Sequence, residues 1–357
     1  MNRYLVASAA LVALCTAPAF AQVFPAPGID NSARITQTGN NNEATIDQAV
    51  NGLINGQNQA EISQSSNAGR AMISQTTATS PRPGGFANTA SIDQRRARTS
   101  ATVEQIHDYQ QAFGNEANIT QIAADAAAAA LQRGDRNFIN IRQLNGSVMP
   151  VASVQQNGIW NRAVVRQGGT NGTVIVRQGD YTNAVGASPV SSRSRATIDN
   201  NGVNSTIYVN QVGFGNEATI FEQGNSGLID ADMYGDQNIT NIDQRSTNGT
   251  IILTTTGASF NNLSDIRQEI SDFGSSATIL QAGAFATANV TQKDLLGLGG
   301  NNQANVQQSG FASGLNNVVS TITQDGGSNL ANVNQMRSLA VSTVTQTGFG
   351  HVSTISQ

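Results

Sequence analysis

Glutamine is the residue whose spacing in this chain most clearly predicts a chemistry, and that chemistry is amide hydrogen bonding. A short phrase recurs: a small residue, any residue, Ile or Val, any residue, Gln. It occurs first as Ala33-Arg-Ile35-Thr-Gln37, and successive glutamines are often eleven residues apart, as in Gln121, Gln132 and Gln143. A side-chain amide both donates and accepts. Glutamines that repeat at a fixed period can therefore bond to their own copies in a stacked array.

The residues needed for catalysis or metal binding do not form a pattern. His107 and His351 are the two histidines, and both are expected in loops. His351 takes the Asn place of a repeat, so a role in the stack is expected for it. Catalysis needs convergent titratable groups, whereas the carboxylates here are single and scattered. We predict no catalytic residue, no metal site and no cofactor, and we do not expect an enzyme.

Side-chain parity predicts the element that positions the glutamines. In the segment from Asn42 to Gln48, the Asn, Ala, Ile and Gln residues share one parity and Glu43, Thr45 and Asp47 share the other. Alternate residues of a strand point to opposite faces. The segment is therefore expected to be a strand with an Ile, Ala and amide face inward and charges outward. A helix is excluded because the apolar pattern has period 2 and lacks the period of 3.6.

Glycine follows the glutamine at a fixed offset. Because glycine readily adopts positive φ, it suits the tight turn that reverses the chain between strands. Seven strand residues and four turn residues give the eleven-residue step, and two steps give a rung of about 22 residues. The predicted turn glycines are Gly39, Gly158, Gly213, Gly283, Gly326 and Gly348.

One rung cannot bury its inner face alone, so the rungs must stack in register. The predicted fold is all-β: a β-solenoid of strand–turn–strand rungs, amyloid-like, with Gln and Asn ladders. A one-residue slip would bury charges such as Asp47, so the amides fix the register while Ile and Val drive burial. The predicted ladder and assembly residues are Gln37, Asn42, Gln48, Gln64, Gln121, Gln156, Asn161, Gln167, Gln324, Asn329, Gln335, Gln346 and Gln357.

Several segments depart from the regular repeat. Degenerate strands are expected to end near Pro189, Asn200, Met233 and Thr255, which brings the stack to about 13–14 rungs and roughly 65 Å. Pro189 should mark a weak rung. The run 126–130 could form a short helix, but a strand with Ala130 in the Ile place fits the spacing better. Longer loops are expected at 49–57, 76–87, 106–114, 293–301 and 309–317.

The N-terminal residues read as an export signal. Arg3 precedes an apolar run, and Ala19-Phe20-Ala21 fits a cleavage site. The expected organisation is a signal peptide at 1–21, a short leader at 22–32 and a repeat array at 33–357. The apolar run is too short to span a membrane, and no transmembrane segment is expected. Charged residues make up 12% of the chain and form no basic patch, so nucleic acid is not an expected partner.

The repeat resembles that of the curlin proteins, whose unit is Gln-x-Gly-x-x-Asn-x-Ala-x-x-x-Gln. The unit is intact from Gln37 to Gln48, with Gly39, Asn42 and Ala44 in place, and it recurs over 156–167 and 324–335. Another copy, starting at Gln211, has its closing Gln223 displaced by one residue. Curlins typically carry about five repeats, and this chain carries more than twice as many rungs.

The resemblance implies an extracellular subunit of curli-like amyloid fibres, which serve adhesion and the biofilm matrix. It implies self-association, possible contact with other curlin subunits, and export through the periplasm by the outer-membrane curli secretion machinery. The regular spacing continues to Gln357, and we expect an uncapped edge there that can receive another chain. Outward Asp and Arg residues would act as gatekeepers against premature pairing.

Two other classes remain open. The first is a monomeric solenoid with a shielded edge that acts as a secreted adhesin or surface-binding protein. Thr321 and Thr323 lie twenty-two residues before Thr343 and Thr345, as in ice-binding solenoids, although the array does not continue because the preceding strand offers Thr278 and Leu280. The second is an enzyme on a solenoid scaffold, which the lack of convergent titratable groups disfavours.

Overall fold

The computed structural model describes residues 20–25, 31–50, 58–77, 88–107, 114–179, 193–256, 260–269, 272–294, 300–309 and 317–357. Within these ranges every regular element is a β-strand and parallel strands are stacked, so the predicted all-β solenoid is confirmed. The chain divides into two compact units. The first comprises Met1–Gly168 and Asp180–Ser191, and the second comprises Gly169–Gly179 and Ser192–Gln357.

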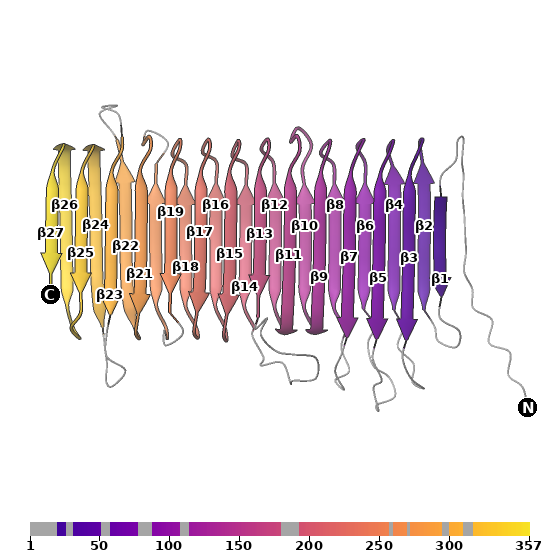
Figure 1. Cartoon of the computed structure of the whole chain (residues 1–357), viewed down its shortest axis with the longest axis horizontal. Helices are drawn as coiled ribbons and strands as arrows, with labels where there is room; N and C mark the ends of the chain where they lie inside the picture. Colours follow the sequence, from indigo (N-terminus) through magenta and orange to yellow (C-terminus); the bar gives the residue numbers. More distant parts are fainter. Residues whose placement is uncertain are drawn as a thin grey trace, which may run out of the picture. The chain divides into compact units, whose positions relative to one another are not determined.

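In the first unit the strands alternate between two parallel sheets as the chain advances (Figure 1). One sheet contains β1 (Phe20–Pro25), β3 (Glu43–Val50), β5 (Arg70–Thr77), β7 (Ser100–His107), β9 (Ala127–Asp135) and β11 (Val151–Ile159). The facing sheet contains β2 (Ser32–Thr38), β4 (Gln59–Ser65), β6 (Thr89–Gln94), β8 (Glu116–Gln121), β10 (Phe138–Gln143) and β12 (Arg162–Gln167).

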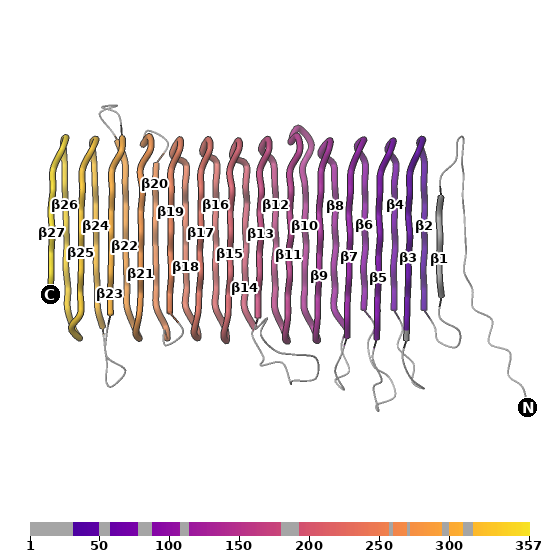
Figure 2. Tube along the Cα trace, viewed as in Figure 1, coloured from indigo at the N-terminus to yellow at the C-terminus, as the bar shows by residue number. Residues whose placement is uncertain are grey.

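The second unit is built in the same way, and Figure 2 shows its chain passing from one sheet to the other at each turn. One sheet contains β13 (Thr173–Gln178), β15 (Thr206–Val212), β17 (Leu228–Tyr234), β19 (Thr250–Thr255), β21 (Ser276–Ala282), β23 (Gln303–Ser309), β25 (Leu330–Gln335) and β27 (Val352–Ser356). The other contains β14 (Arg195–Asn200), β16 (Glu217–Glu222), β18 (Ile239–Gln244), β20 (Leu263–Gln268), β22 (Ala286–Lys293), β24 (Val318–Gly327) and β26 (Val341–Phe349).

Equivalent residues of successive rungs lie directly beside one another. In the pairing of β8 with β10, Gln121 lies opposite Gln143. In the pairing of β21 with β23, Ile279 lies opposite Val306 and Gln281 lies opposite Gln308. The sequence period therefore becomes columns of identical side chains, because each strand pairs with the strand two positions along the chain.

The inward face has the parity that the sequence predicts. In β8, Ala117, Ile119 and Gln121 are buried, and the residues between them are more exposed. Removal of Ile, Val and Ala side chains from water stabilises the stack by roughly 25 cal/mol per Å² of apolar surface buried. Charged residues lie mainly outward, where opposite charges of neighbouring rungs meet, as in Arg34 with Glu61 at 3.6 Å.

The irregular segments follow the eleven-residue spacing where the structure describes them. The Ala-rich run belongs to strand β9, and Ala130 lies opposite Val103, so the predicted strand is confirmed there. The degenerate strands expected to end at Asn200, Met233 and Thr255 are β14, β17 and β19. The strand expected near Pro189 and most of the expected long loops lie outside the described residues.

The N-terminal residues include a strand for which the sequence spacing gave no indication. Strand β1 pairs in parallel with β3, and its first two residues, Phe20 and Ala21, precede the expected cleavage point. Its composition, with Val23 and two phenylalanines, has high strand propensity. Part of the expected leader therefore continues the sheet.

The corner glycines allow main chain to stack on main chain. Gly134 has φ of 106°, and a Cβ atom there would lie 2.1 Å from the carbonyl oxygen of Gly158 in the next rung. We expect Gly134→Ala to lower the free energy of unfolding by about 3 kcal/mol. Left-handed backbone strain contributes about 1–2 kcal/mol, and overpacking contributes the rest.

Gly146 is the matched control for this prediction. It has φ of 90° in the same unit, and a Cβ atom there would meet nothing within 4 Å. Gly146→Ala should cost only the backbone term of about 1–2 kcal/mol. Urea unfolding followed by circular dichroism measures both variants. Equal shifts would contradict the close approach of the corners.

Candidate functional site

The buried glutamines form ladders of direct hydrogen bonds. In each, the Nε2 of one glutamine donates to the Oε1 of the glutamine in the next rung. In one sheet of the first unit the donors and acceptors run Gln37 to Gln64, Gln94, Gln121, Gln143 and Gln167, with distances of 2.6, 2.7, 2.8, 2.9 and 3.0 Å. In the facing sheet they run Gln48 to Gln75, Gln105, Gln132 and Gln156, at 2.8, 2.8, 2.8 and 3.1 Å.

Most of these glutamine amides also reach the opposite sheet. The Nε2 of Gln64 donates to the main-chain oxygen of Glu43 at 3.1 Å, and that of Gln121 donates to Ser100 at 2.9 Å. Both donors of the amide are thus used, one along the stack and one across it. An amide that is buried but fully hydrogen-bonded avoids the cost of desolvation. The ladders therefore fix the register along each sheet and fasten the two sheets together.

The asparagines form the predicted side-chain ladder in only a few places, such as Nδ2 of Asn238 donating to Oδ1 of Asn216 at 3.2 Å, and bond mainly to the main chain. The backbone N–H of Asn161 donates to Oδ1 of Asn137 at 3.1 Å, and the Nδ2 of Asn137 donates to the carbonyl of Gly158 at 2.9 Å. In the same way, the backbone N–H of Asn329 donates to Oδ1 of Asn302 at 3.2 Å. The backbone N–H of Gly69 donates to Oδ1 of Asn42 at 2.9 Å. The shorter side chain bonds to the main chain of the turns, so asparagine fastens the corners.

The ladders of the second unit contain replacements. In one sheet Gln178 bonds to Gln211 at 2.7 Å, and Gln281 begins a run to Gln308, Gln335 and Gln357 at 3.1, 3.1 and 3.2 Å. In the other, Gln268 begins a run to Gln292, Gln324 and Gln346 at 2.8, 2.9 and 2.9 Å. Met233 and Thr255 replace glutamine in the first sheet, and Asn200 and Glu222 replace it in the second.

Glu222 is a buried acid at a ladder position that glutamine occupies in other strands. The sequence repeat assigns the end of this unit in β16 to Gln223 instead. Glu222, not Gln223, lies opposite Gln244. Here the ladder reverses, because Nε2 of Gln244 donates back to Oε2 of Glu222 at 2.6 Å. Burial raises the pKa of Glu222 to about 7 against the lowering effect of hydrogen bonds from Gly224 and Gln244. The signal was present in the sequence, since Ala218-Thr-Ile220-Phe-Glu222 has the spacing of the repeat phrase.

Three further acids are buried at corners, where strand parity gave no prediction: Asp135, Asp272 and Asp294. Asp135 lies 2.6 Å from His107, which is the last residue of β7 and is buried, so its expected loop position is corrected. Burial, together with the smaller effect of the charge of Asp294, raises the pKa of Asp272 to about 6. Ser275 and Asn302 donate hydrogen bonds to Asp272.

The other predicted positions are found as follows. The six predicted turn glycines all have positive φ, between 99° and 141°. His351 lies in the asparagine place, and its backbone N–H donates to Oδ1 of Asn329 at 3.0 Å. Gln357 is exposed, while the other predicted ladder glutamines are buried.

The threonine array has a different neighbour from the expected one. Thr321 and Thr323 pair in register with Thr343 and Thr345, and their other neighbours are Asn289 and Thr291 of β22. Thr278 and Leu280 belong to the opposite sheet. One column therefore contains three threonines and the adjacent column contains two.

The geometry is that of a structural protein. Runs of glutamines bond in the same geometry along each sheet. Within the described ranges, no helix has the length and apolar character needed to cross a membrane.

The family comparison agrees with this class. Residues 28–53 match the model of the curlin associated repeat. The repeat and the solenoid fold are those of a structural protein family rather than an enzyme family. A search of curated proteins gives no match.

Proposed function

We propose that this chain is an extracellular structural subunit that assembles with its own copies into curli-like amyloid fibres for adhesion and biofilm matrix. The observation that carries the proposal is the directional glutamine ladder. Within an uninterrupted run, a glutamine donates to the next and accepts from the one before, as Gln308 does with Gln335 and Gln281. Because donor and acceptor are identical side chains, a second chain in register can continue the same bonds.

The edge formed by β26 and β27 suits such an addition. Each of these strands has one neighbour in its sheet within the described residues. Val352 of β27 is 70% exposed and Val341 of β26 is 62% exposed, so apolar side chains there remain uncovered. The amide of Gln346 donates to Oγ of Ser353 at 3.2 Å, in place of a further glutamine. Open edges with unpaired backbone groups template strand addition.

The proposal includes export. A signal peptide at 1–21 would be removed after Ala21, leaving a leader at 22–32 and the repeat array at 33–357. The mature chain would pass through the periplasm and the outer-membrane curli secretion machinery, and would assemble with itself or with other curlin subunits. It would end as a fibre at the cell surface.

Fibre growth tests the proposal. The purified mature chain should form fibres that bind thioflavin, give cross-β diffraction and grow faster when pre-formed seeds are added. We expect the double variant Gln346→Glu, Gln357→Glu to elongate at least ~10-fold more slowly, since about 1.4 kcal/mol changes a rate by a factor of ten. The cause is that a carboxylate at either position has no N–H to donate to the acceptor that the next chain would supply, and its charge would be buried at the joint between chains. The rate of seeded growth is the measurement.

The matched control places the same charges on the outer face. Thr345→Glu with Ser356→Glu changes the residues next to the ladder positions, and both side chains are exposed. This variant should elongate within about 2-fold of the parent, because exposed like charges interact weakly. If the parent chain stays monomeric for days at high concentration, the assembly proposal fails.

A monomeric surface-binding solenoid is the second candidate. Two adjacent columns of threonines form a regular hydroxyl array on one face. One contains Thr291, Thr323 and Thr345, and the other contains Thr321 and Thr343. A chain that remains monomeric and slows ice growth would support this candidate. A chain that forms fibres and does not slow ice growth would contradict it.

A further inference from the structure

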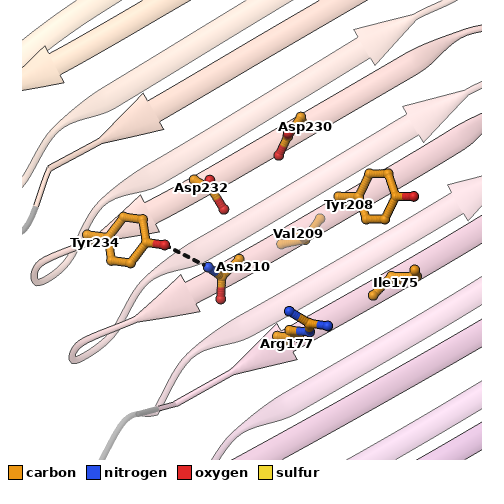
Figure 3. Close-up of a pocket in the computed structure, with 8 residues that line it drawn as sticks. All are labelled: Ile175, Arg177, Tyr208, Val209, Asn210, Asp230, Asp232 and Tyr234. Carbon is orange, nitrogen blue, oxygen red and sulfur yellow. Dashed lines mark hydrogen bonds between the residues drawn. The ribbon is translucent and has the colours of Figure 1, made fainter. Parts of the chain in front are cut away.

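The outward face of β13, β15 and β17 carries a groove of about 400 Å³ in the second unit. Its polar and aromatic lining consists of Arg177, Tyr208, Asn210, Asp230, Asp232 and Tyr234. Figure 3 shows Asp230 and Asp232 on one strand, with Tyr234 beyond Asp232 and Tyr208 on the neighbouring strand. The volume lies within the range of small-ligand sites, about 300–1,000 Å³.

The two carboxylates of the groove lack the paired opposite charge that several outward residues have elsewhere. Across neighbouring rungs, Arg195 meets Glu217 at 3.5 Å and Lys293 meets Asp325 at 3.3 Å. In the groove, Asp230 lies between Tyr208 and Ile252, and Asp232 lies between Asn210 and Thr254. Neither carboxylate therefore has a cation as its neighbour in register.

The remaining cation of the groove is farther away. Arg177 lies opposite Asn210 in register, and Asn210 lies opposite Asp232. Two strand spacings, or roughly 9–10 Å, therefore separate the main chain of Arg177 from that of Asp232. Asp230 and Asp232 lie two residues apart on one face, about 6.5–7 Å along the strand. Partial burial and the charge of Asp232 raise the pKa of Asp230. The groove thus holds negative charge that is partly desolvated and that a cation would stabilise.

The tyrosines give the groove flat, amphipathic walls. Tyr208 is 41% exposed, which leaves ring surface open to a ligand. Tyr234 is held in place, because Nδ2 of Asn210 donates to its hydroxyl at 3.1 Å. Aromatic faces attract cations and stack on apolar ring faces. Elsewhere the columns that contain these positions continue as aliphatic and short polar residues such as Ile252, Thr254 and Thr278.

We propose that this groove binds an amino sugar, that is, a pyranose bearing a protonated amine, as a unit of a cationic polysaccharide. The ring would stack on Tyr208, the ammonium group would lie between Asp230 and Asp232, and Asn210 and Arg177 would bond to hydroxyl groups. A saccharide fits better than a simple cation because the groove combines ring walls and amide groups with its charge. The site does not depend on fibre formation, since one chain contains all of it.

Binding of defined oligosaccharides to the mature chain tests the proposal. Isothermal titration of the β-1,4-linked glucosamine tetramer should show saturable binding at pH 6, where the amines are protonated. The N-acetylated tetramer, which has the same rings without the charge, should bind at least ~10-fold more weakly, a factor equal to about 1.4 kcal/mol. Spermine and tetralysine, which have charge without sugar rings, should also bind at least ~10-fold more weakly.

Variants separate the contributions. The double variant Asp230→Asn, Asp232→Asn should weaken tetramer binding at least ~10-fold, and Tyr208→Ala should do the same, while Tyr208→Phe should retain binding within about 3-fold because the ring remains. Asp265→Asn, an exposed outward residue of β20, is the control and should change nothing. Circular dichroism checks that each variant is folded.

Each contrary result overturns the proposal. Equal binding of spermine or tetralysine would make the groove a general cation surface, and equal binding of the N-acetylated tetramer would make it a neutral-sugar site. Absence of tetramer binding would leave no ligand site. The titration uses unassembled chain, so these outcomes are distinct from failure of fibre growth.

Discussion

Replacing Gln308 by glutamate should lower the free energy of unfolding by about 3–5 kcal/mol at pH 8, the cost of leaving an uncompensated charge buried. The Nε2 of Gln308 now donates to the carbonyl of Thr287 at 2.9 Å and to Oε1 of Gln335 at 3.1 Å. A carboxylate at the same place would face these oxygen atoms and could donate to none of them. Protonation restores one donor, so the loss should shrink as the pH falls.

The adjacent residue provides the control. Gln307 belongs to the same strand, has the opposite parity and is exposed. Gln307→Glu introduces the same charge one residue away and should change the free energy of unfolding by less than about 0.5 kcal/mol. Urea unfolding at pH 5 and pH 8 measures both variants. If the two variants are equally stable at pH 8, the glutamine ladder does not contribute to stability as its geometry implies.

The sequence predicted the parity and register because both depend only on spacing. Period 2 within a strand placed Ile119 and Gln121 inward, and the eleven-residue step aligned Gln121 with Gln143. The regularity also identified Ala130 as a core residue within an Ala-rich run. Where one period is imposed on many rungs, a single weak segment is constrained by its neighbours above and below.

Spacing predicted that the glutamines bond to their own copies, and the ladders confirm this, but it did not predict the partners of the asparagines. Glutamine and asparagine differ by one methylene, which lets Gln132 reach Gln156 while Asn137 instead reaches the carbonyl of Gly158. The sheet partner of the threonine array was also missed, since Thr321 pairs with Asn289, two strands back along the chain, and not with the strand that immediately precedes it. Spacing gives columns, whereas side-chain length and sheet alternation decide the contacts.

Burial at the corners was the second limit. His107 has the parity of the buried Gln105, but the predicted strand ended at the glutamine, and Asp135 breaks the alternation after the buried Gly134. Their contact at 2.6 Å depends on how neighbouring turns close over one another. Glu222 differs from them because the spacing of the repeat phrase predicts its ladder position. What the spacing did not predict is that an acid would occupy a buried column.

Glu222→Gln should stabilise the second unit by about 3 kcal/mol at pH 8 and should have little effect at pH 4. The pKa of Glu222 is raised from 4.5 to about 7. The folded chain therefore binds more protons than the unfolded chain between these values, and stability falls as the pH rises through that window. Each unit of pKa difference corresponds to 1.36 kcal/mol. Above pH 7 the loss is complete, and glutamine avoids it because it does not titrate.

Glutamine at position 222 would also restore the direction of the ladder. Gln244 now donates backward to Glu222, and Oε1 of Gln244 has no hydrogen-bond partner within the described structure. An amide at 222 could donate to that oxygen and free Gln244 to donate forward. The variant should keep a smaller pH dependence from Asp272, whose pKa is raised to about 6. Its free energy of unfolding should fall between pH 4 and pH 6 by less than that of the parent falls through the titration of Glu222.

The control for this prediction is Glu217→Gln on the same strand. Glu217 faces outward and lies 3.5 Å from Arg195, so its loss should cost at most about 1 kcal/mol, as for other surface ion pairs. Urea midpoints between pH 4 and pH 8 separate the two variants. A slope between pH 6 and pH 8 that persists unchanged in Glu222→Gln would show that another group titrates. Its disappearance would identify one carboxyl in a glutamine column as the cause of the pH dependence of the stack.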